Sequence, residues 1–264
     1  MLQALNGKDC ERIPWAPRMD LWYIALRERG TLPSELREAN VADIAEYFGF
    51  GCHAVRADFT QPRAKDANMF RGLGLENHPD FPYRFRLDDL PVRYEVNGEE
   101  TKTTVETSIG ELTFRLRYSK EMRREGISQP FKLEYPVEVP EDLDRAAEFF
   151  ENLQIDPEPE AYRAFHDRIG EQGVAVAHGS IAASPFHLLL HELMPMDQFF
   201  FWYYDRYEEL KRFEERVTPF FDRLMKTAAS SGAEVALWGT NFDRDLTWPP
   251  FFEKDIAPWL KRAR

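Results

Sequence analysis

The sequence predicts an α/β fold of the TIM (β/α)8-barrel type, incomplete, with about four of the eight strand–helix units and an antiparallel β-hairpin insertion. Three observations favour this fold. Short apolar runs bounded by glycine alternate with longer stretches of helical periodicity, as in parallel strands joined by helices. Residues 88–120 instead alternate apolar and polar side chains around a turn. The 264 residues are 43% hydrophobic, which is enough for the core of a single domain over residues 1–264.

The first part of the chain contains two predicted strands, each close to predicted helices. Residues 11–20 carry two prolines, which bias the preceding residues toward an extended conformation, so this segment is the first strand candidate. Helical periodicity follows over residues 21–29 and 34–48. Residues 52–59 are the second strand candidate, because an apolar run begins directly after a pair of glycines.

The turn signal Asn97-Gly98 predicts the antiparallel insertion, which we expect to cover the barrel mouth or an interface. Further helices are predicted at residues 141–153 and 157–170, and one or two helices at residues 196–204 and 206–230. The last two strands are predicted at residues 173–180 and 234–238, the second of them buried on both faces. A final helix opens at Pro249-Pro250, since proline suits a first helical turn.

Composition excludes several classes of function. The net charge of −12 argues against a nucleic-acid backbone or an anionic membrane surface as the main partner. Two distant cysteines, Cys10 and Cys52, support neither a disulfide framework nor a cysteine zinc site. No apolar run is long enough to span a bilayer and no signal sequence precedes the first helix, so we expect a cytoplasmic protein.

Polar side chains lie at the carboxyl ends of the predicted strands, where open α/β sheets and (β/α) barrels place their chemistry. They are Arg18 and Asp20, Arg56 and Asp58, and Asn241 and Asp243. We expect Asp58 and Asp243 to be catalytic and the other four to bind substrate, since an arginine can hold a carboxylate at two points. The alternatives are that the aspartates cap a loop or helix, and that Arg18 pairs with a neighbouring acid.

His187 and His191 are four residues apart, so on a helix they share a face. Their spacing would suit a metal, but the third ligand of a zinc helix is missing and we expect no metal site in this chain. We expect His191 to be catalytic, as a proton donor, and His187 to bind substrate by hydrogen bonding. Plain packing in the core is the alternative for both.

Several phrases of the sequence resemble the uroporphyrinogen decarboxylase superfamily, in the family's order and over nearly the whole chain. One is the opening of the last helix, with Pro249, Pro250, Phe252, Ile256, Pro258, Trp259 and Leu260. Another is the loop and helix at residues 182–194, and a third is the insertion phrase at Thr107, Gly110 and Leu112.

The resemblance implies a barrel whose mouth binds a tetrapyrrole or corrinoid. In the decarboxylases an aspartate corresponding to Asp58 faces the pyrrole nitrogens, and a tyrosine near the propionates corresponds to His191. Haem-pathway members also carry a two-arginine loop, of which only Arg18 is present here. The insertion phrase and the lost arginine make the chain more similar to corrinoid-dependent methyltransferases.

The resemblance also implies that about four further strand–helix units follow in the family, so we expect a member truncated at its C-terminus. Methyltransferase members bind zinc through residues of that part, and zinc and corrinoid are therefore expected only when it is supplied. Expected partners are a small-molecule or tetrapyrrole substrate, a corrinoid protein, and either further copies of the chain or a C-terminal partner chain.

Three functions follow as hypotheses. The first is methyl transfer involving a methylcorrinoid partner. The second is decarboxylation of uroporphyrinogen, with Arg18 holding a carboxylate and Asp58 the pyrrole nitrogens. The third is a non-catalytic half-barrel that acts as a binding or assembly module.

Overall fold

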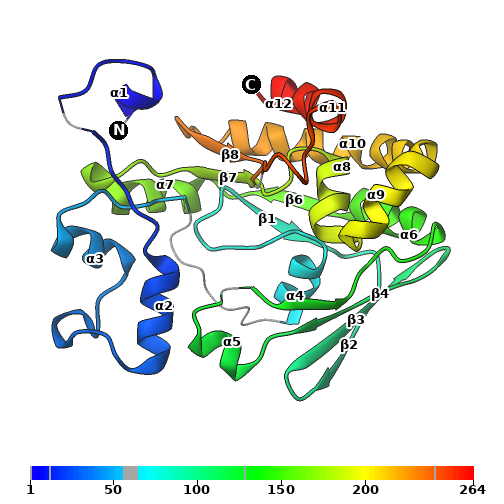
Figure 1. Cartoon of the computed structure of the whole chain (residues 1–264), viewed down its shortest axis with the longest axis horizontal. Coiled ribbons are helices and arrows are strands. Elements are labelled where there is room, and N and C mark those ends of the chain that lie inside the picture. Colours follow the sequence, from blue (N-terminus) through cyan, green and yellow to red (C-terminus); the bar gives the residue numbers. More distant parts are fainter. Residues whose placement is uncertain (1, 12, 56–64, 128, 241) are drawn as a thin grey trace.

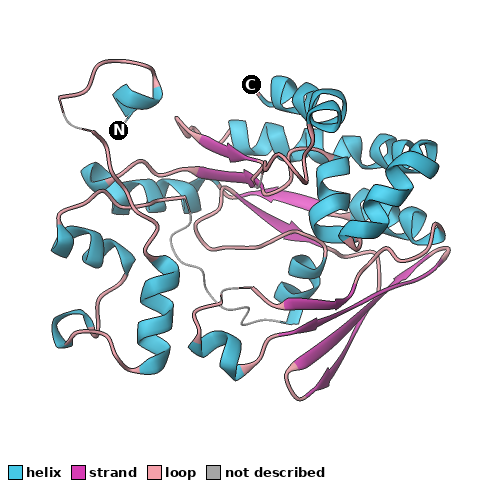
Figure 2. Ribbon diagram, in the orientation of Figure 1, coloured by secondary structure: helices cyan, strands magenta, loops and turns pink. Residues whose placement is uncertain are grey.

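The computed structural model describes residues 2–11, 13–55, 65–127, 129–240 and 242–264. Figure 1 shows helices and strands mixed along the chain. The antiparallel sheet, which has four strands, lies at one end, and the helices α2 (Asp20–Arg29) and α3 (Val41–Phe48) lie at the other. Figure 2 shows that the strands form separate open sheets and no closed barrel within the described residues. The α/β class is confirmed, whereas a complete barrel is not formed by this part of the chain.

The helices are α1 (Leu2–Leu5), α2 (Asp20–Arg29), α3 (Val41–Phe48), α4 (Lys65–Gly72), α5 (Lys120–Arg124), α6 (Glu141–Asn152), α7 (Pro159–Ile169), α8 (Pro185–Leu188), α9 (Met196–Asp205), α10 (Tyr207–Ala229), α11 (Pro249–Phe251) and α12 (Ala257–Ala263). Short 3-10 turns are η1 (Ser34–Leu36) and η2 (Gly170–Gln172), and π-helical turns are η3 (Leu189–Leu193) and η4 (Phe252–Ile256). The strands are β1 (Tyr83–Arg86), β2 (Val92–Asn97), β3 (Glu100–Thr107), β4 (Gly110–Arg117), β5 (Phe131–Glu134), β6 (Gln154–Pro157), β7 (Ala177–Ser180) and β8 (Ala236–Trp238).

Parallel pairing joins three segments that are consecutive strand candidates in the sequence. β7 pairs in parallel with β8, and a parallel bridge joins Cys52 to Gly173 just before β7. The Gly51 N–H also donates to the Trp15 carbonyl at 2.9 Å. The segments around residues 15, 52, 177 and 237 thus lie side by side in chain order, which is the arrangement of neighbouring strands in a (β/α) barrel.

The insertion forms an antiparallel sheet, as predicted, in the order β2-β3-β4-β5. Its fourth strand, β5, lies beyond residue 120 and was not predicted. β1 and β6 form a further antiparallel pair that the sequence analysis also missed. The alternation that would have identified β1 is present, because Tyr83 and Phe85 are buried while Arg84 and Arg86 are exposed.

Helix α6 connects the antiparallel sheet to the rest of the core. It contacts β3 and β4 on one side and α10 on the other. Its Phe150 ring lies 5.1 Å from that of Phe220 on α10, and Phe220 in turn lies 5.9 Å from Phe85 of β1. One hydrophobic core therefore runs from the antiparallel sheet through α6 and α10 to the parallel strands.

The helix α3 illustrates how local sequence sets an element's ends. The Asn40 side chain accepts the N–H groups of Ala42 and Asp43, and the Asp43 carboxylate accepts the Asn40 N–H at 2.8 Å, which forms a capping box. Gly49 ends the helix with a φ of 70°. This cap explains why residues 34–48 are not one helix, as we predicted, but a 3-10 turn followed by α3.

All four predicted strands differ from the structure in extent, existence or burial. Described residues of the 11–20 segment form no strand, because the only ladder-like bond there is the one from Gly51 to Trp15. The predicted strand from residue 52 already turns at Ala54 and Val55, and β7 begins at Ala177 rather than at residue 173. β8 is not buried on both faces, since Ala236 is exposed and its other two residues are only partly buried.

Candidate functional site

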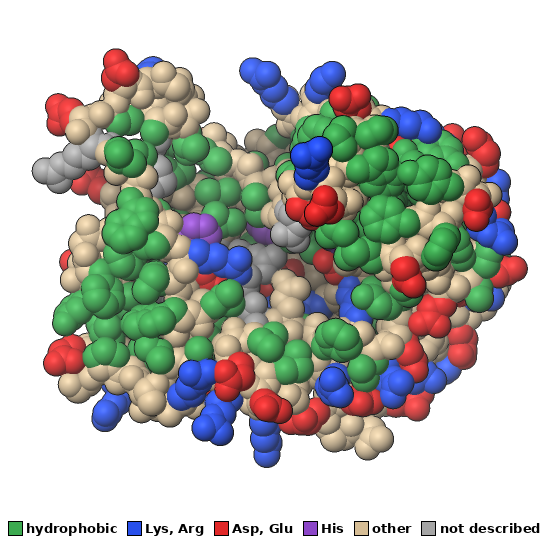
Figure 3. Space-filling model, in the orientation of Figure 1, with side chains coloured by type: hydrophobic (Ala, Val, Ile, Leu, Met, Phe, Trp, Pro, Cys, Tyr) green, Lys and Arg blue, Asp and Glu red, His purple; other side chains and the backbone are tan. Residues whose placement is uncertain are grey.

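The candidate site is a cavity of about 350 Å³ at the carboxyl ends of the parallel segments. Its wall is made by Arg18, His53, Val55, Gln129, Ile181, Ala182, His191, Glu192, Leu237 and Thr240. Val55, Ile181 and Thr240 directly follow the segment around residue 52, β7 and β8, so the cavity lies where a (β/α) barrel has its mouth. Figure 3 shows a hollow in this face of the molecule, with histidine and Lys or Arg side chains beside it.

Arg18 lines the cavity and forms an ion pair with Asp20. Arg18 Nε donates to Asp20 Oδ1 at 3.1 Å, and the Asp20 side chain is 9% exposed while that of Arg18 is 50% exposed. Asp20 is the first residue of α2, not the end of a strand. Near this pair, burial lowers the pKa of His53, the Asp20 charge opposes that shift, and the Arg18 charge adds to it.

His191 brings an imidazole to the cavity wall, from the π-helical turn η3. Its ring is perpendicular to that of His187, with centroids 4.5 Å apart. Burial lowers the pKa of His191, an effect that the charges of Glu192 and Asp243 oppose and that of Lys132 increases. A π-helical turn changes the direction of side chains along a helix, and such turns are frequent at functional sites.

His187 is 1% exposed and belongs to the interior rather than to the cavity wall. Its Nδ1 accepts the Ala183 N–H at 3.0 Å, and its ring stacks on Phe242 at 5.1 Å. Burial, followed by the charge of His191, lowers the pKa of His187 to about 3. The ring is therefore neutral at any physiological pH.

Glu192 lies between this cavity and a second, smaller one. Lys132 Nζ donates to both Glu192 Oε2 and the Glu192 carbonyl at 2.5 Å, and the two side chains are 12% and 18% exposed. A Cβ atom on Gly74 would lie 2.6 Å from Glu192 Cγ, so Gly74 leaves room for this side chain. The carboxylate is thus held in one place by an ion pair and by close packing.

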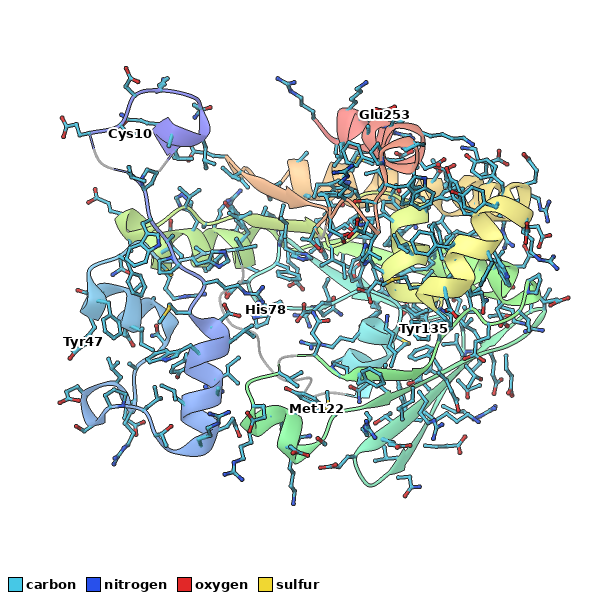
Figure 4. All side chains as sticks on the ribbon, viewed as in Figure 1. Cys10, Tyr47, His78, Met122, Tyr135 and Glu253 are labelled. Carbon is cyan, nitrogen blue, oxygen red and sulfur yellow. The ribbon has the colours of Figure 1, made fainter. Side chains whose placement is uncertain are left out.

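The inner cavity has a volume of about 40 Å³ and shares Gln129, Ile181 and Glu192 with the larger one. On its wall the Tyr83 hydroxyl donates to the Gly179 carbonyl at 2.8 Å and lies 3.1 Å from His178 Nδ1. The His178 ring stacks on Phe81 at 4.3 Å. His78, labelled at the centre of Figure 4, packs against the same Phe81 ring.

The predicted site residues are only partly brought together. Arg18 and His191 line the cavity, and Asp20 forms an ion pair with Arg18. The buried His187 ring packs against the His191 ring. Asp243 is exposed, and its Oδ1 accepts the N–H groups of Asp245 and Leu246, which is the capping role weighed as the alternative. The charge of Asp243 nevertheless raises the pKa of His191, against the lowering caused by burial. Arg56, Asp58 and Asn241 lie outside the described residues.

Sequence reasoning missed His53, Gln129, Glu192 and Lys132. His53 stands in the predicted second strand and Glu192 directly follows His191, so both were adjacent to the predicted residues. Gln129 and Lys132 come from the connection around β5, which no periodicity marks. No pattern in the sequence predicts that this connection lies at the carboxyl ends of the parallel strands.

Across the described residues, no group of three His, Cys, Asp or Glu side chains converges as metal ligands would. In the same part of the chain, no helix combines the length and apolar character that crossing a bilayer requires. Comparisons with protein-family models, curated proteins and solved structures found no match to this chain.

Proposed function

We propose that this chain belongs to the uroporphyrinogen decarboxylase superfamily and serves methyl transfer from a methylcorrinoid partner to a small acceptor. The observation that carries the proposal is the cavity of about 350 Å³ at the carboxyl ends of the parallel segments. This is the place where enzymes built on (β/α) units bind substrate. The family assignment itself rests on the sequence phrases described above.

The size and lining of the cavity favour a small acceptor over a whole tetrapyrrole. Sites for drug-sized ligands span about 300–1,000 Å³, so this cavity is at the lower limit. A uroporphyrinogen carries eight carboxylates, and Arg18 is the only Lys or Arg side chain among the described residues that line the cavity. Val55, Ile181 and Leu237 offer apolar contact instead.

The roles of the side chains follow from their positions. Arg18 supplies positive charge for an anionic group of the acceptor, and His191 and Glu192 line the same cavity as polar contacts. In the transfer, the acceptor atom forms its bond to the methyl carbon as the carbon–cobalt bond breaks, and cobalt keeps the electron pair. Zinc does not fit the described residues, because they offer no set of three ligands, and no step is assigned to it.

The proposal is tested with methylcobalamin and a small panel of thiols, with and without added zinc, on the chain supplied with the C-terminal part of the family domain. Loss of the methyl–cobalt absorption and formation of a methyl thioether are expected for the wild-type chain and for Arg84→Gln, which breaks an exposed ion pair with Glu158 and does not line either cavity. Arg18→Gln and His191→Gln should reduce the rate by a factor of at least about 10, the effect of one lost polar contact in a transition state. No methyl transfer by the wild-type chain under any of these conditions would refute it.

Uroporphyrinogen is the control substrate for the second hypothesis. Formation of coproporphyrinogen that requires Arg18 would replace methyl transfer by decarboxylation as the function. The same preparations serve for both assays, so one outcome cannot be mistaken for the other.

A binding or assembly module remains the second candidate, because one region of the surface is unusually apolar. Phe201 and Tyr204 on α9 are 67% and 71% exposed, and Figure 3 shows a large apolar area on that side of the molecule. The second edge of β8 is unpaired by any described strand. Sedimentation equilibrium distinguishes the candidates: self-association lost in Phe201→Ser supports assembly, and a monomer at all concentrations counts against it.

A further inference from the structure

The carboxylate of Glu192 is fixed in its orientation by one neighbouring ammonium group. Lys132 Nζ donates to Glu192 Oε2 and also to the backbone carbonyl of Glu192, so it holds the side chain and the main chain of the same residue. Gly74 leaves the space that the Glu192 side chain occupies. A carboxylate held in this way presents its second oxygen in a defined direction.

That second oxygen, Oε1, is open. It accepts no hydrogen bond from the described residues, and it is not among the side-chain atoms that are shielded from solvent. An ion pair that is largely buried stabilises a protein only when its remaining lone pairs also find hydrogen-bond donors. The donors for Oε1 must therefore come from whatever fills the space beside Glu192.

Glu192 lies on the walls of two cavities that differ in what they can hold. The inner cavity, at about 40 Å³, has room for a few water molecules. The outer cavity, at about 350 Å³, has room for a small organic ligand. A ligand in the outer cavity therefore has the Glu192 carboxylate on its wall, at the border with the inner one.

An open carboxylate oxygen on a cavity wall discriminates between ligands. A group without a donor that covers Oε1 would leave the oxygen unpaired, which costs more than an ordinary hydrogen bond contributes. A group with an O–H or N–H bond reproduces the hydrogen bond of the water that it displaces. Sites built around such a polar atom reject an analogue that lacks the matching donor.

The charges of the wall indicate that the donor is uncharged. Lys132 compensates the charge of Glu192, and Asp20 compensates that of Arg18. Burial lowers the pKa of both histidines that line the outer cavity, which favours their neutral forms. The described part of the wall thus has no net charge that would select an ammonium group over a hydroxyl or an amide.

We propose that Glu192 is the specificity-determining residue of the outer cavity and selects a ligand with an uncharged O–H or N–H donor, a hydroxyl or a primary amide. Under the proposed function, on which this identification of the ligand rests, the ligand is the acceptor of the methyl group. The selectivity itself is a property of binding and is measured without a corrinoid.

Two fragments of nearly equal size test the selectivity. Propionamide and butanone share a carbonyl group, and propionamide has an NH2 group where butanone has a methyl group. Each is titrated into the nitrogen-15-labelled chain, and the backbone amide signals of Ala182, His191 and Thr240 on the cavity wall are followed by NMR. We expect propionamide to bind at least about tenfold more tightly, as one hydrogen bond to a charged group implies.

The wild-type chain alone can overturn the proposal. Butanone that binds as tightly as propionamide would show that the wall does not require a donor. Propionamide that leaves all three signals unchanged up to about 100 mM, which covers the affinities of fragments this small, would show that the cavity takes no such ligand.

Glu192→Gln changes what the wall offers and keeps the size of the side chain. The Lys132 ammonium holds the amide oxygen, since an NH2 group cannot accept, so a donor replaces Oε1. Both fragments can accept from it through their carbonyl oxygens, and the ratio of their affinities should fall to about one. Glu253→Gln removes the same charge from an exposed residue outside both cavities, labelled in Figure 4, and should keep the wild-type ratio.

The two proposals fail separately in these experiments. A tenfold preference that persists in folded Glu192→Gln protein would assign the selection to another group and overturn the role of Glu192. A preference that is lost only in this variant supports that role, even if no methyl transfer is found. Methyl transfer together with equal binding of the two fragments would uphold the proposed function and overturn the selectivity.

Discussion

The buried ring of His187 makes the stability of the protein depend on pH in a specific way. Its pKa is about 3 in the folded protein and 6.5 without perturbation. Because the folded ring resists the proton, stability is full above pH 6.5 and falls as the pH drops toward 3, where the unfolded chain alone binds the proton. Between about pH 7.5 and about pH 5.5 this histidine becomes protonated in the unfolded chain alone, where the protonated form comes to exceed the neutral form roughly tenfold. The free energy of unfolding therefore falls by between about 1 and 2 kcal/mol.

Urea unfolding followed by circular dichroism measures this cost. His187→Asn keeps an acceptor for Ala183 and removes the titrating group, so it serves as the reference. We expect wild-type protein to lose between about 1 and 2 kcal/mol more than this variant over the same pH interval, a difference of about 0.5 M in urea midpoint. Histidines such as His53, whose pKa burial also lowers, titrate in both proteins and cancel. Equal losses in the two proteins would refute the reasoning.

Three further predictions concern other buried groups. Lys132→Met should destabilise the protein by about 1–3 kcal/mol, because it leaves the Glu192 carboxylate unpaired, and adding Glu192→Gln should recover part of that loss in urea unfolding. Gly72→Ala should lower the melting temperature, since the new Cβ would lie 1.9 Å from Phe114 Cε2, and Phe114→Leu in the same chain should restore part of it. Burial raises the pKa of the Cys52 thiol, so iodoacetamide should modify it more slowly than the other cysteine, as peptide mass spectrometry will show.

The elements that sequence predicted well are those whose signals are local. Helix α6 was predicted at residues 141–153 and runs over Glu141–Asn152, because acidic residues in its first turn and an apolar stripe are both visible in the sequence. The hairpin β2–β3 follows from the turn at Asn97-Gly98, and Gly98 indeed has a φ of 61°. Both signals lie within a few residues of the structure that they specify.

The failures depend on partners that are distant in sequence. Strand β8 looks buried in the sequence because its run Val235–Trp238 is apolar, yet burial of a strand requires elements packed on both of its faces, and Ala236 of β8 is exposed. β5 is a strand because β4 offers it an edge. Such pairings cannot be read from the short segments themselves.

For the candidate site, sequence located the region but few of the interactions. It singled out Arg18 and His191, which do line one cavity. It assigned Asp20 a substrate-binding role, whereas that carboxylate binds Arg18. Glu192 went unnoticed because its position depends on the π-helical turn and on Lys132 from a remote connection. Residue type and spacing predict which groups are available, and tertiary contacts decide which of them meet.

The pairing of β1 with β6 also bears on the order in which the molecule folds. Their paired residues are roughly 70 positions apart, whereas β2, β3 and β4 pair through two-residue connections. Such hairpins close within about 1–10 μs. Once formed, the hairpins shorten the flexible chain that must close before β1 can meet β6, which lowers the entropic cost of that step. We therefore expect β1–β6 pairing to come late in refolding. Tyr83 of β1 contacts His178, so the inner cavity should be among the last features of the protein to assemble.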